Sequence, residues 1–333
     1  AAMEGLFPSP PTRHRWGAVM ETRLGPAGAV LGRFYALFAL LMAFTMGALA
    51  QSGALADTFA AAFALPRYKV GLATAVLALI ILLGGVRSIA GTSTMLVPVM
   101  ALLYIGGGLA VILGNGDRLP EAMALMVRCA FAPEAALGGA LGIVTRREAL
   151  RWGVARSVFS NEAGLGSAAI TAACADTDEP VKQGLISMTG VFFDTMVICT
   201  VTGLAICCSG TLGTADGAGR PLTGAALTLR AFETVLGPLA PWLIGVALGL
   251  FAFTSVLGCA VQAETTASYL LGPGAVRPCR VLYGLAVFAG AVIPMATVLQ
   301  LADLANALMA FPNLVCLLLL SGEIAGECGR KER

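Results

Sequence analysis

The sequence predicts an all-α polytopic membrane protein. Of its 333 residues, 58% are hydrophobic and only 12% are charged, whereas a soluble domain has about 25% charged residues. Several stretches carry almost no charge over about 20 residues, the length that an α-helix needs to cross a bilayer. Since backbone groups in lipid must be satisfied within one segment, these stretches are expected to be helices with the lipid bilayer as partner.

Eight apolar segments are expected to cross the membrane. They cover approximately residues 34–54, 70–86, 95–114, 153–175, 183–208, 240–263, 279–296 and 300–320. A short helix is expected at 224–236, and the mixed residues 115–150 suit short amphipathic helices and a half-buried hairpin. We expect three parts: a leader or loop at 1–31, a transmembrane domain at 32–322 and a charged tail at 323–333.

Charged, proline and glycine residues separate these segments. Residues 66–69, from Pro66 to Lys69, end the first segment, and Arg87 ends the second. A glycine-rich stretch, SGTLGTADGAGRPLTGA at 209–225, separates the fifth segment from the sixth. When the long connection 115–156 is left out, Lys and Arg gather on the side of the two termini, which predicts cytoplasmic termini. The expected location is the inner membrane of a bacterial cell.

The composition argues against several classes of protein. The net charge is only +2, without a basic patch that interleaves aromatic residues, so we expect no nucleic-acid partner. The nine cysteines form no CxxC pair and mostly lie in apolar segments, which predicts buried thiols. His14, the only histidine, lies in the polar leader, and HExxH and GxSxG motifs are missing from the sequence. We therefore expect neither an enzyme nor a cofactor.

One apolar segment contains a polar stretch, SVFSNEAGLGSAAI at 157–170. An ionised carboxylate at the centre of a membrane helix costs at least about 2.5–3.5 kcal/mol, so Glu162 is expected to face a cavity, an ion or a partner. Gly164 and Gly166 favour unwinding beside it. Transporters use broken helices at the membrane midplane to hold substrate and ions. We expect such a break here; the alternative is that Glu162 caps a half-helix near the interface and the glycines pack helices.

Two more acids lie in apolar segments. Asp194 suits either a gate or cation pathway, or a solvated helix end at the interface. Asp303 and Asn306 lie three residues apart and therefore share a helix face. They suit hydrogen bonds between packed helices, which we favour, or a gate.

Three uncharged polar residues are further candidates. Gln51, at the end of the first segment, suits either a contact with a zwitterion or an interhelical hydrogen bond. Thr254 and Ser255 are adjacent hydroxyls deep in a segment. They either bond back to the i−4 carbonyl or complete an oxygen cage for a hard monovalent cation.

These segments resemble the alanine/glycine:sodium symporter family. The resemblance is carried by GVARSVFSNEAGLGSAAI at 153–170, by DEPVKQGLISMTGVFFDTMVICT at 178–200, and by LTGAALTLRAF and FAFTSVLG further on. It covers essentially residues 32–320 in order. The family implies the leucine-transporter fold, two inverted five-helix repeats in which core helices one and six are broken. In that register 153–175 is core helix six, the eight segments are core helices three to ten, and core helices one and two are absent.

The resemblance also implies the site residues. The broken stretch would line the amino-acid site and hold the substrate ammonium with its free carbonyls, Gln51 would face the substrate, and Thr254 and Ser255 would bind sodium. The expected substrate-site residues are Gln51, Ser160, Asn161, Glu162, Ala163, Gly164, Gly166, Ser167 and Cys259, and the expected gate or ion-path residues are Asp194 and Asp303.

Several positions depart from the family pattern. Ala169 and Ala172 stand where a proline and a histidine are usual. Cys259, Val261 and Gln262 stand where the family has a tryptophan and paired tyrosines. This difference enlarges or reshapes the expected pocket. Near Gln51, Gly53 stands where an asparagine is usual in the family.

The resemblance implies sodium-coupled symport of a small neutral amino acid, alanine or glycine, by alternating access. Coupling requires that sodium and substrate favour different conformers. Two alternatives stay open at this point. One is a truncated, non-transporting remnant or regulatory membrane protein. The other is a proton-coupled carrier with Glu162 or Asp194 as the proton-carrying group.

Overall fold

The computed structural model describes residues 25–131, 146–162, 164–172, 180–215, 217, 219 and 221–331. In this part of the chain helices dominate, and Ala215 and Pro221 form an isolated β-bridge. Six helical stretches are long and apolar enough to cross a membrane, by length and composition. They are Pro26–Phe63, Gly85–Gly114, Val181–Ser209, Pro241–Leu271, Pro273–Val292 and Met295–Gly322. The prediction of a helical polytopic membrane protein is therefore confirmed.

Two of the eight expected crossings have a different form. The segment at 70–86 becomes α4 (Arg67–Leu83), which has only 17 residues. The segment at 153–175 is divided into α8 (Arg146–Asn161) and α9 (Ser167–Ala172). The count of eight crossings thus stays a prediction. The short helix expected at 224–236 is present as α12 (Gly224–Leu236).

The first and last long helices extend beyond the expected segments. Helix α2 (Pro26–Met42) begins eight residues before 34 and includes the end of the expected leader. Proline at its first turn is preorganised for a helix, and Gly25 turns the chain there with a φ of 57°. Helix α15 (Met295–Lys331) continues into the expected charged tail as far as Lys331.

Three long helices contain a stretch of π-helix. A wider turn of this kind is common at functional sites. The first runs from α2 through η1 into α3, the second from α10 through η3 into α11, and the third from η5 into α13. Their bounds are η1 Ala43–Ala50, α3 Gln51–Phe63, α10 Pro180–Phe192, η3 Phe193–Cys199, α11 Thr200–Ser209, η5 Pro241–Gly245 and α13 Val246–Leu271.

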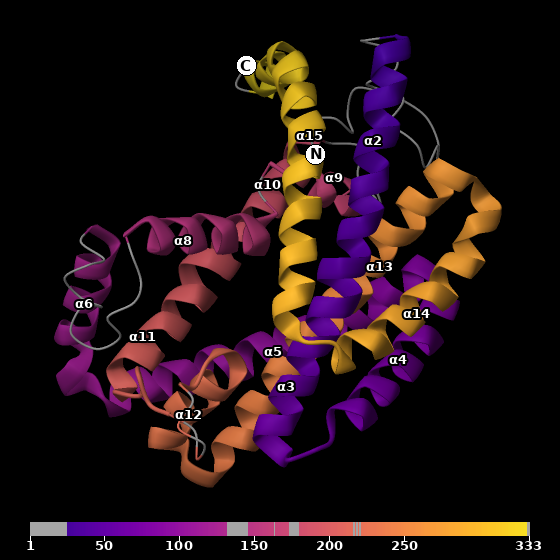
Figure 1. The fold of residues 1–333 in the computed structure, drawn as a ribbon. Coiled ribbons are helices and arrows are strands. Elements are labelled where there is room, and N and C mark those ends of the chain that lie inside the picture. The colour runs from indigo at the N-terminus through magenta and orange to yellow at the C-terminus, as the bar shows by residue number, and fades with distance from the viewer. Residues whose placement is uncertain are drawn as a thin grey trace.

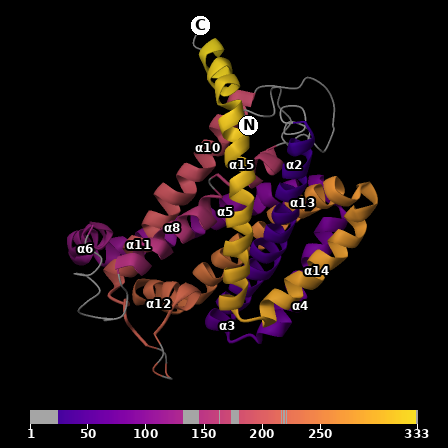
Figure 2. The same ribbon diagram turned by 45° about the horizontal axis from the view of Figure 1, so that its top comes forward.

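Helix α13 lies at the centre of the packing. It contacts α2, η1, α3, α5, α9 and α14, while α15 lies beside α2 and α14 lies beside α4 (Figures 1 and 2). The remaining elements are α5 Gly85–Gly114, η2 Gly116–Arg118, α6 Leu119–Phe131, η4 Gly237–Leu239, η6 Pro273–Ala275 and α14 Val276–Val292.

The buried side chains form separate apolar clusters between these helices. One surrounds Tyr283 between η1, α4, α13 and α14, and a second surrounds Phe232 between α5, α11 and α12. A third joins α2 and α15 to Leu165. Large apolar side chains such as Leu113 and Leu318 remain more than 70% exposed. Exposed leucines on long apolar helices are what a lipid-facing surface requires.

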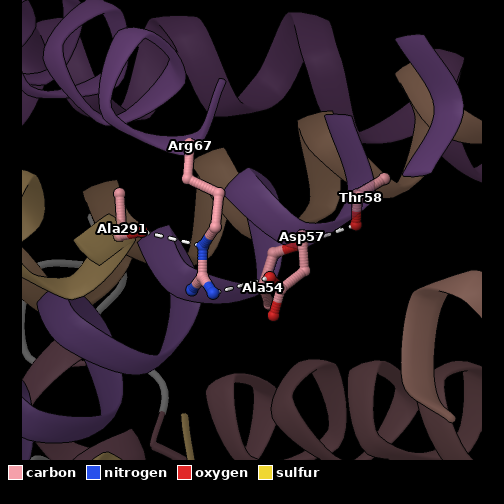
Figure 3. Close-up of polar contacts among 5 residues, drawn as sticks. All are labelled: Ala54, Asp57, Thr58, Arg67 and Ala291. Carbon is pink, nitrogen blue, oxygen red and sulfur yellow. Dashed lines mark hydrogen bonds and ion pairs between the residues drawn. The ribbon is translucent and has the colours of Figure 1, made fainter. Parts of the chain in front are cut away.

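Arg67 joins the turn between α3 and α4 to the end of α14 (Figure 3). The guanidinium of Arg67 lies 3.3 Å from the carboxylate of Asp57. Its Nε also donates to the carbonyl of Ala291, at 3.0 Å. The charge of Asp57 thus has a fixed partner within the fold.

Candidate functional site

The polar stretch predicted to unwind does so. Helix α8 ends at Asn161, and α9 begins only at Ser167. Glu162 has a left-handed backbone with a φ of 49°, and Gly164 and Gly166 have φ values of 75° and 82°. Such angles interrupt a right-handed helix. The expected helix break is therefore confirmed, although Ala163 lies outside the described residues.

Gly166 allows this break to pack closely on two helices. A Cβ atom there would lie 2.5 Å from Oδ1 of Asn313 on α15 and 2.8 Å from the hydroxyl of Tyr35 on α2. Since both distances are below van der Waals contact, no larger side chain fits without a shift. Asn313 also donates through Nδ2 to the carbonyl of Gly164, at 2.8 Å. An unwound carbonyl thus receives the donor that it needs inside a membrane.

The end of α8 is joined to the π-helical stretch η3. The hydroxyl of Ser160 donates to Asp194, at 3.1 Å, and the hydroxyl of Thr195 donates to Oδ1 of Asn161. Both bonds connect the turn before the break to adjacent residues of η3. The structure therefore brings Asp194, an expected gate or ion-path residue, to the expected substrate site.

The carboxylate of Glu162 has neutral hydrogen-bond donors. The buried hydroxyl of Ser167 and the Nε2 of Gln262 on α13 both donate to Oε2, the latter at 3.4 Å. Glu162 itself is half-buried, whereas Gln262 is only 4% exposed. Within the described part of the chain, no arginine or lysine forms an ion pair with Glu162.

Asp303 has a charged partner instead. One guanidinium nitrogen of Arg156 on α8 donates to both of its carboxylate oxygens, at 2.5 and 2.6 Å. The favoured interpretation, hydrogen bonds between packed helices, agrees with the contacts of Asp303, which accepts from Arg156 on another helix. Because Arg156 lies on α8, this contact is an ion pair that connects α15 to α8. Asn306 is buried, and its side-chain amide has no hydrogen bond within the described residues.

Cys259 lies at a close contact between η1 and α13, and Gln51 lies one turn away from it. A Cβ atom on Gly47 would lie 2.1 Å from the Cβ of Cys259, so only glycine fits at that crossing. Gln51 follows Gly47 by one helical turn and begins α3, where it is half-buried. Helix crossings with small residues are typical of membrane proteins.

Thr254 and Ser255 both bond back to their own helix. Each hydroxyl donates to the carbonyl of Phe251, at 3.0 Å. This is the local alternative that the sequence left open. Both side chains are half-buried on α13, two turns before Gln262.

Four residues at this site had no expected role. Asn313 and Tyr35 contact the break, Gln262 contacts Glu162, and Arg156 pairs with Asp303. Two of them left a signal in the sequence. Asn313 lies on the same helix face as Asn306, seven residues earlier, and Arg156 is a lone cation in an expected membrane segment.

The sequence of the chain was compared with those of known proteins. Residues 16–329 match the Sodium:alanine symporter family. The chain is 38% identical over 303 residues to the "Sodium/alanine symporter AgcS" of Methanococcus maripaludis, covering 90% of this chain and 64% of that protein. It is 38% identical to the "Probable sodium/glutamine symporter GlnT" of Bacillus subtilis, covering 86% of this chain and 59% of that protein.

A third relative is described with protons as well as sodium. The "Putative sodium/proton-dependent alanine carrier protein YrbD" of Bacillus subtilis is 32% identical, with 90% of this chain and 65% of that protein covered. The chain thus spans less than two thirds of the length of each of these relatives. Since the match extends over nearly all of the present sequence, the chain belongs to the sodium:alanine symporter family.

Proposed function

We propose that the protein is a sodium-coupled symporter for a small neutral amino acid of the alanine or glycine class. The observation that carries this proposal is the break at residues 162–166. Polar side chains of α13 and α15 contact the break, and η3 contacts the turn before it. An interrupted membrane helix with free backbone groups is the usual place for substrate and ions in secondary transporters. Family membership supports the same function.

The proposal includes the leucine-transporter fold, with α8 and α9 as the two halves of core helix six. The division of this segment into two short helices supports that register. Alternating access would then move one group of helices against another around the break. We further propose a multi-pass protein of the cell membrane with cytoplasmic termini, in line with the charge distribution.

The substrate would lie against the unwound stretch. Its ammonium would bind backbone carbonyls freed by the break, and Gln51 and Cys259 would form a neighbouring wall. The close contact of Gly47 with Cys259 supports this arrangement, because it sets Gln51 one turn from the crossing with α13. Sodium would bind at Thr254 and Ser255, whose hydroxyls would have to turn from the Phe251 carbonyl toward the ion.

Uptake by proteoliposomes tests the proposal. The full-length gene product would be reconstituted and supplied with labelled alanine, glycine or glutamine, with an inward sodium gradient or with choline in its place. We expect alanine or glycine uptake that needs the sodium gradient. Uptake that is equal in sodium and choline, or no uptake of any of the three, would contradict sodium-coupled symport of a small neutral amino acid.

Proton coupling is a second candidate. It is favoured by the neutral donors around two acids at the break, Glu162 and Asp194. A relative described as sodium/proton-dependent adds support. Uptake at saturating sodium would be measured across a range of pH values. A rate that does not change with pH counts against proton coupling.

A further inference from the structure

Helices α4 and α14 lie side by side and run in opposite directions (Figures 1 and 2). At one end of this pair, Arg67 at the start of α4 donates to the carbonyl of Ala291 near the end of α14. At the other end, a Cβ atom on Gly85, where α5 begins, would lie 3.9 Å from Nη2 of Arg280 on α14. The end of α4 and the beginnings of α5 and α14 therefore meet at one edge of the molecule.

Two more arginines lie at this edge. Arg277 precedes Arg280 by three residues, on the same side of α14, and Arg87 lies in the first turn of α5. Both Arg87 and Arg277 are exposed. Ile89 and Cys279, which follow them by two residues, belong to one buried apolar cluster. Arg87, Arg277 and Arg280 are therefore placed around the end of one core, and we call them the arginine edge.

Only part of this positive charge is balanced by the helices that form the arginine edge. Arg280 donates two hydrogen bonds to the carboxylate of Glu264 on α13, at 2.7 and 2.8 Å. The sequence continues without acids around it, since residues 67–114 and 265–302 contain no Asp or Glu. One carboxylate thus stands against three guanidinium groups, and the two exposed arginines keep their charge.

The surface next to the arginine edge is apolar. Ile80 and Leu83 on α4 are 61% and 74% exposed, and Val281 and Leu285 on α14 are 57% and 61% exposed. Aliphatic side chains exposed on membrane helices lie against lipid acyl chains. Positive charge at the end of an apolar surface is the pattern that a phospholipid requires, because its charged headgroup and its acyl chains must both find partners.

We propose that the arginine edge binds the phosphate of an anionic phospholipid, whose acyl chains lie on α4 and α14. Arg87 and Arg277 make the contact, while Arg280 stays paired with Glu264. A guanidinium group suits this role because it donates two parallel hydrogen bonds to a phosphate. Basic pockets between membrane helices on the cytoplasmic side bind anionic headgroups in this way. The proposal does not depend on amino-acid transport by this protein.

Lipid titration followed by native mass spectrometry tests the proposal. The full-length gene product in detergent would be titrated with phosphatidylglycerol, which is anionic, or with phosphatidylcholine of the same chain length, which has no net charge. We expect the first phosphatidylglycerol to bind more tightly than phosphatidylcholine. Arg87→Gln/Arg277→Gln should weaken phosphatidylglycerol binding about 25-fold, because each basic residue at a membrane surface contributes about fivefold.

A matched variant removes the same amount of exposed charge elsewhere. Lys69 lies in the first turn of α4, at the opposite end of the α4–α14 pair, and Arg230 on α12 pairs with Glu233 at 3.0 Å. Lys69→Gln/Arg230→Gln should therefore bind phosphatidylglycerol as the wild type does. Thermal unfolding would establish that each variant is folded. If Arg87→Gln/Arg277→Gln fails to fold, the single variant Arg277→Gln decides the result, with an expected loss of about fivefold.

Four outcomes would overturn the proposal. The first is unchanged phosphatidylglycerol binding in folded Arg87→Gln/Arg277→Gln, and the second is an equal loss in Lys69→Gln/Arg230→Gln, which would indicate a general effect of charge. The third is equal affinity of the wild type for the two lipids. The fourth is displacement of phosphatidylglycerol by an equal concentration of inorganic phosphate, because the edge would then be a site for a free anion. None of these measurements depends on uptake, so a failure of the proposed transport function remains distinguishable.

Discussion

The carboxylate of Glu264, which belongs to α13, and that of Glu162, which contacts α13 at Gln262, have opposite surroundings. Glu264 belongs to the helix, is 8% exposed, and receives two hydrogen bonds from Arg280 of α14, at 2.7 and 2.8 Å. Glu162 belongs to the break and reaches the same helix at Gln262, where its partners are neutral. Among the described residues, the first charge has an arginine as its partner and the second has none.

This difference separates a structural acid from a functional one. A paired, buried carboxylate gains nothing from an added cation, since its oxygens already have charged donors. An unpaired carboxylate beside unwound backbone does gain from one. The same contrast applies to Asp303, whose bond to Arg156 joins α15 to α8 just before the break. We therefore expect substitutions of the two kinds of acid to affect different properties.

The largest expected effect is on stability, at the paired acid. Glu264→Gln leaves the half-buried guanidinium of Arg280 without its carboxylate, and breaking a fully buried pair costs about 3–5 kcal/mol, which is the upper bound here. Glu162→Gln removes an uncompensated charge and should not lower stability. Thermal unfolding in one detergent measures both variants. An equal loss of stability in the two would show that the charges do not differ as described.

A double variant of the Glu264–Arg280 ion pair is the control for this loss of stability. The double variant Glu264→Gln/Arg280→Met removes both charges and should recover most of the stability lost in the single variant. If the double variant is as unstable as the single one, the loss comes from packing rather than from the unpaired guanidinium.

A smaller effect is expected from the backbone of the break. Gly166→Ala forces a side chain into a left-handed conformation and into contact with Asn313 and Tyr35, which should cost about 1–3 kcal/mol. Gly91→Ala on α5 is the matched control, because a Cβ atom there meets nothing within 4 Å. It should be neutral or stabilise by up to about 1 kcal/mol. Similar unfolding temperatures for both variants would contradict the close packing at Gly166.

The smallest effect on stability is expected at the hydroxyls of α13. Thr254→Val and Ser255→Ala each remove a bond to the Phe251 carbonyl, worth about 0.5–1.5 kcal/mol at most. If these hydroxyls bind sodium during transport, uptake should need about tenfold more sodium in the double variant. An unchanged sodium dependence would show that these hydroxyls do not bind sodium during transport.

The local part of this site could be predicted from the sequence. Glu162, Gly164 and Gly166 together conflict with a continuous membrane helix, because they combine a charge inside an apolar segment with two residues of poor helix propensity. These three residues lie close together in the sequence, so the conflict is visible locally. The break and the short helix at 224–236 were therefore predictable without tertiary information, and both are present.

Partners distant in sequence could not be predicted in the same way. Gln262 meets Glu162 across 100 positions, and Asn313 meets Gly164 across 149. Their pairing depends on which faces of α13 and α15 point to the break. The sequence of a helix in lipid indicates its buried face only weakly, because both of its faces are hydrophobic. Helix ends were also missed, since Pro26 begins α2 inside a stretch that reads as a polar leader.

The contrast between Glu264 and Glu162 can be tested directly by the effect of sodium on unfolding. A ligand that binds only the folded protein raises its stability, by about 2.7 kcal/mol at a hundredfold excess over its Kd. We predict that sodium chloride, compared with choline chloride, raises the unfolding temperature of the wild type and of Glu233→Gln equally. The increase should be clearly smaller in Glu162→Gln. An increase in Glu162→Gln equal to that of the wild type would contradict a role in sodium binding for this carboxylate, whose donors are neutral.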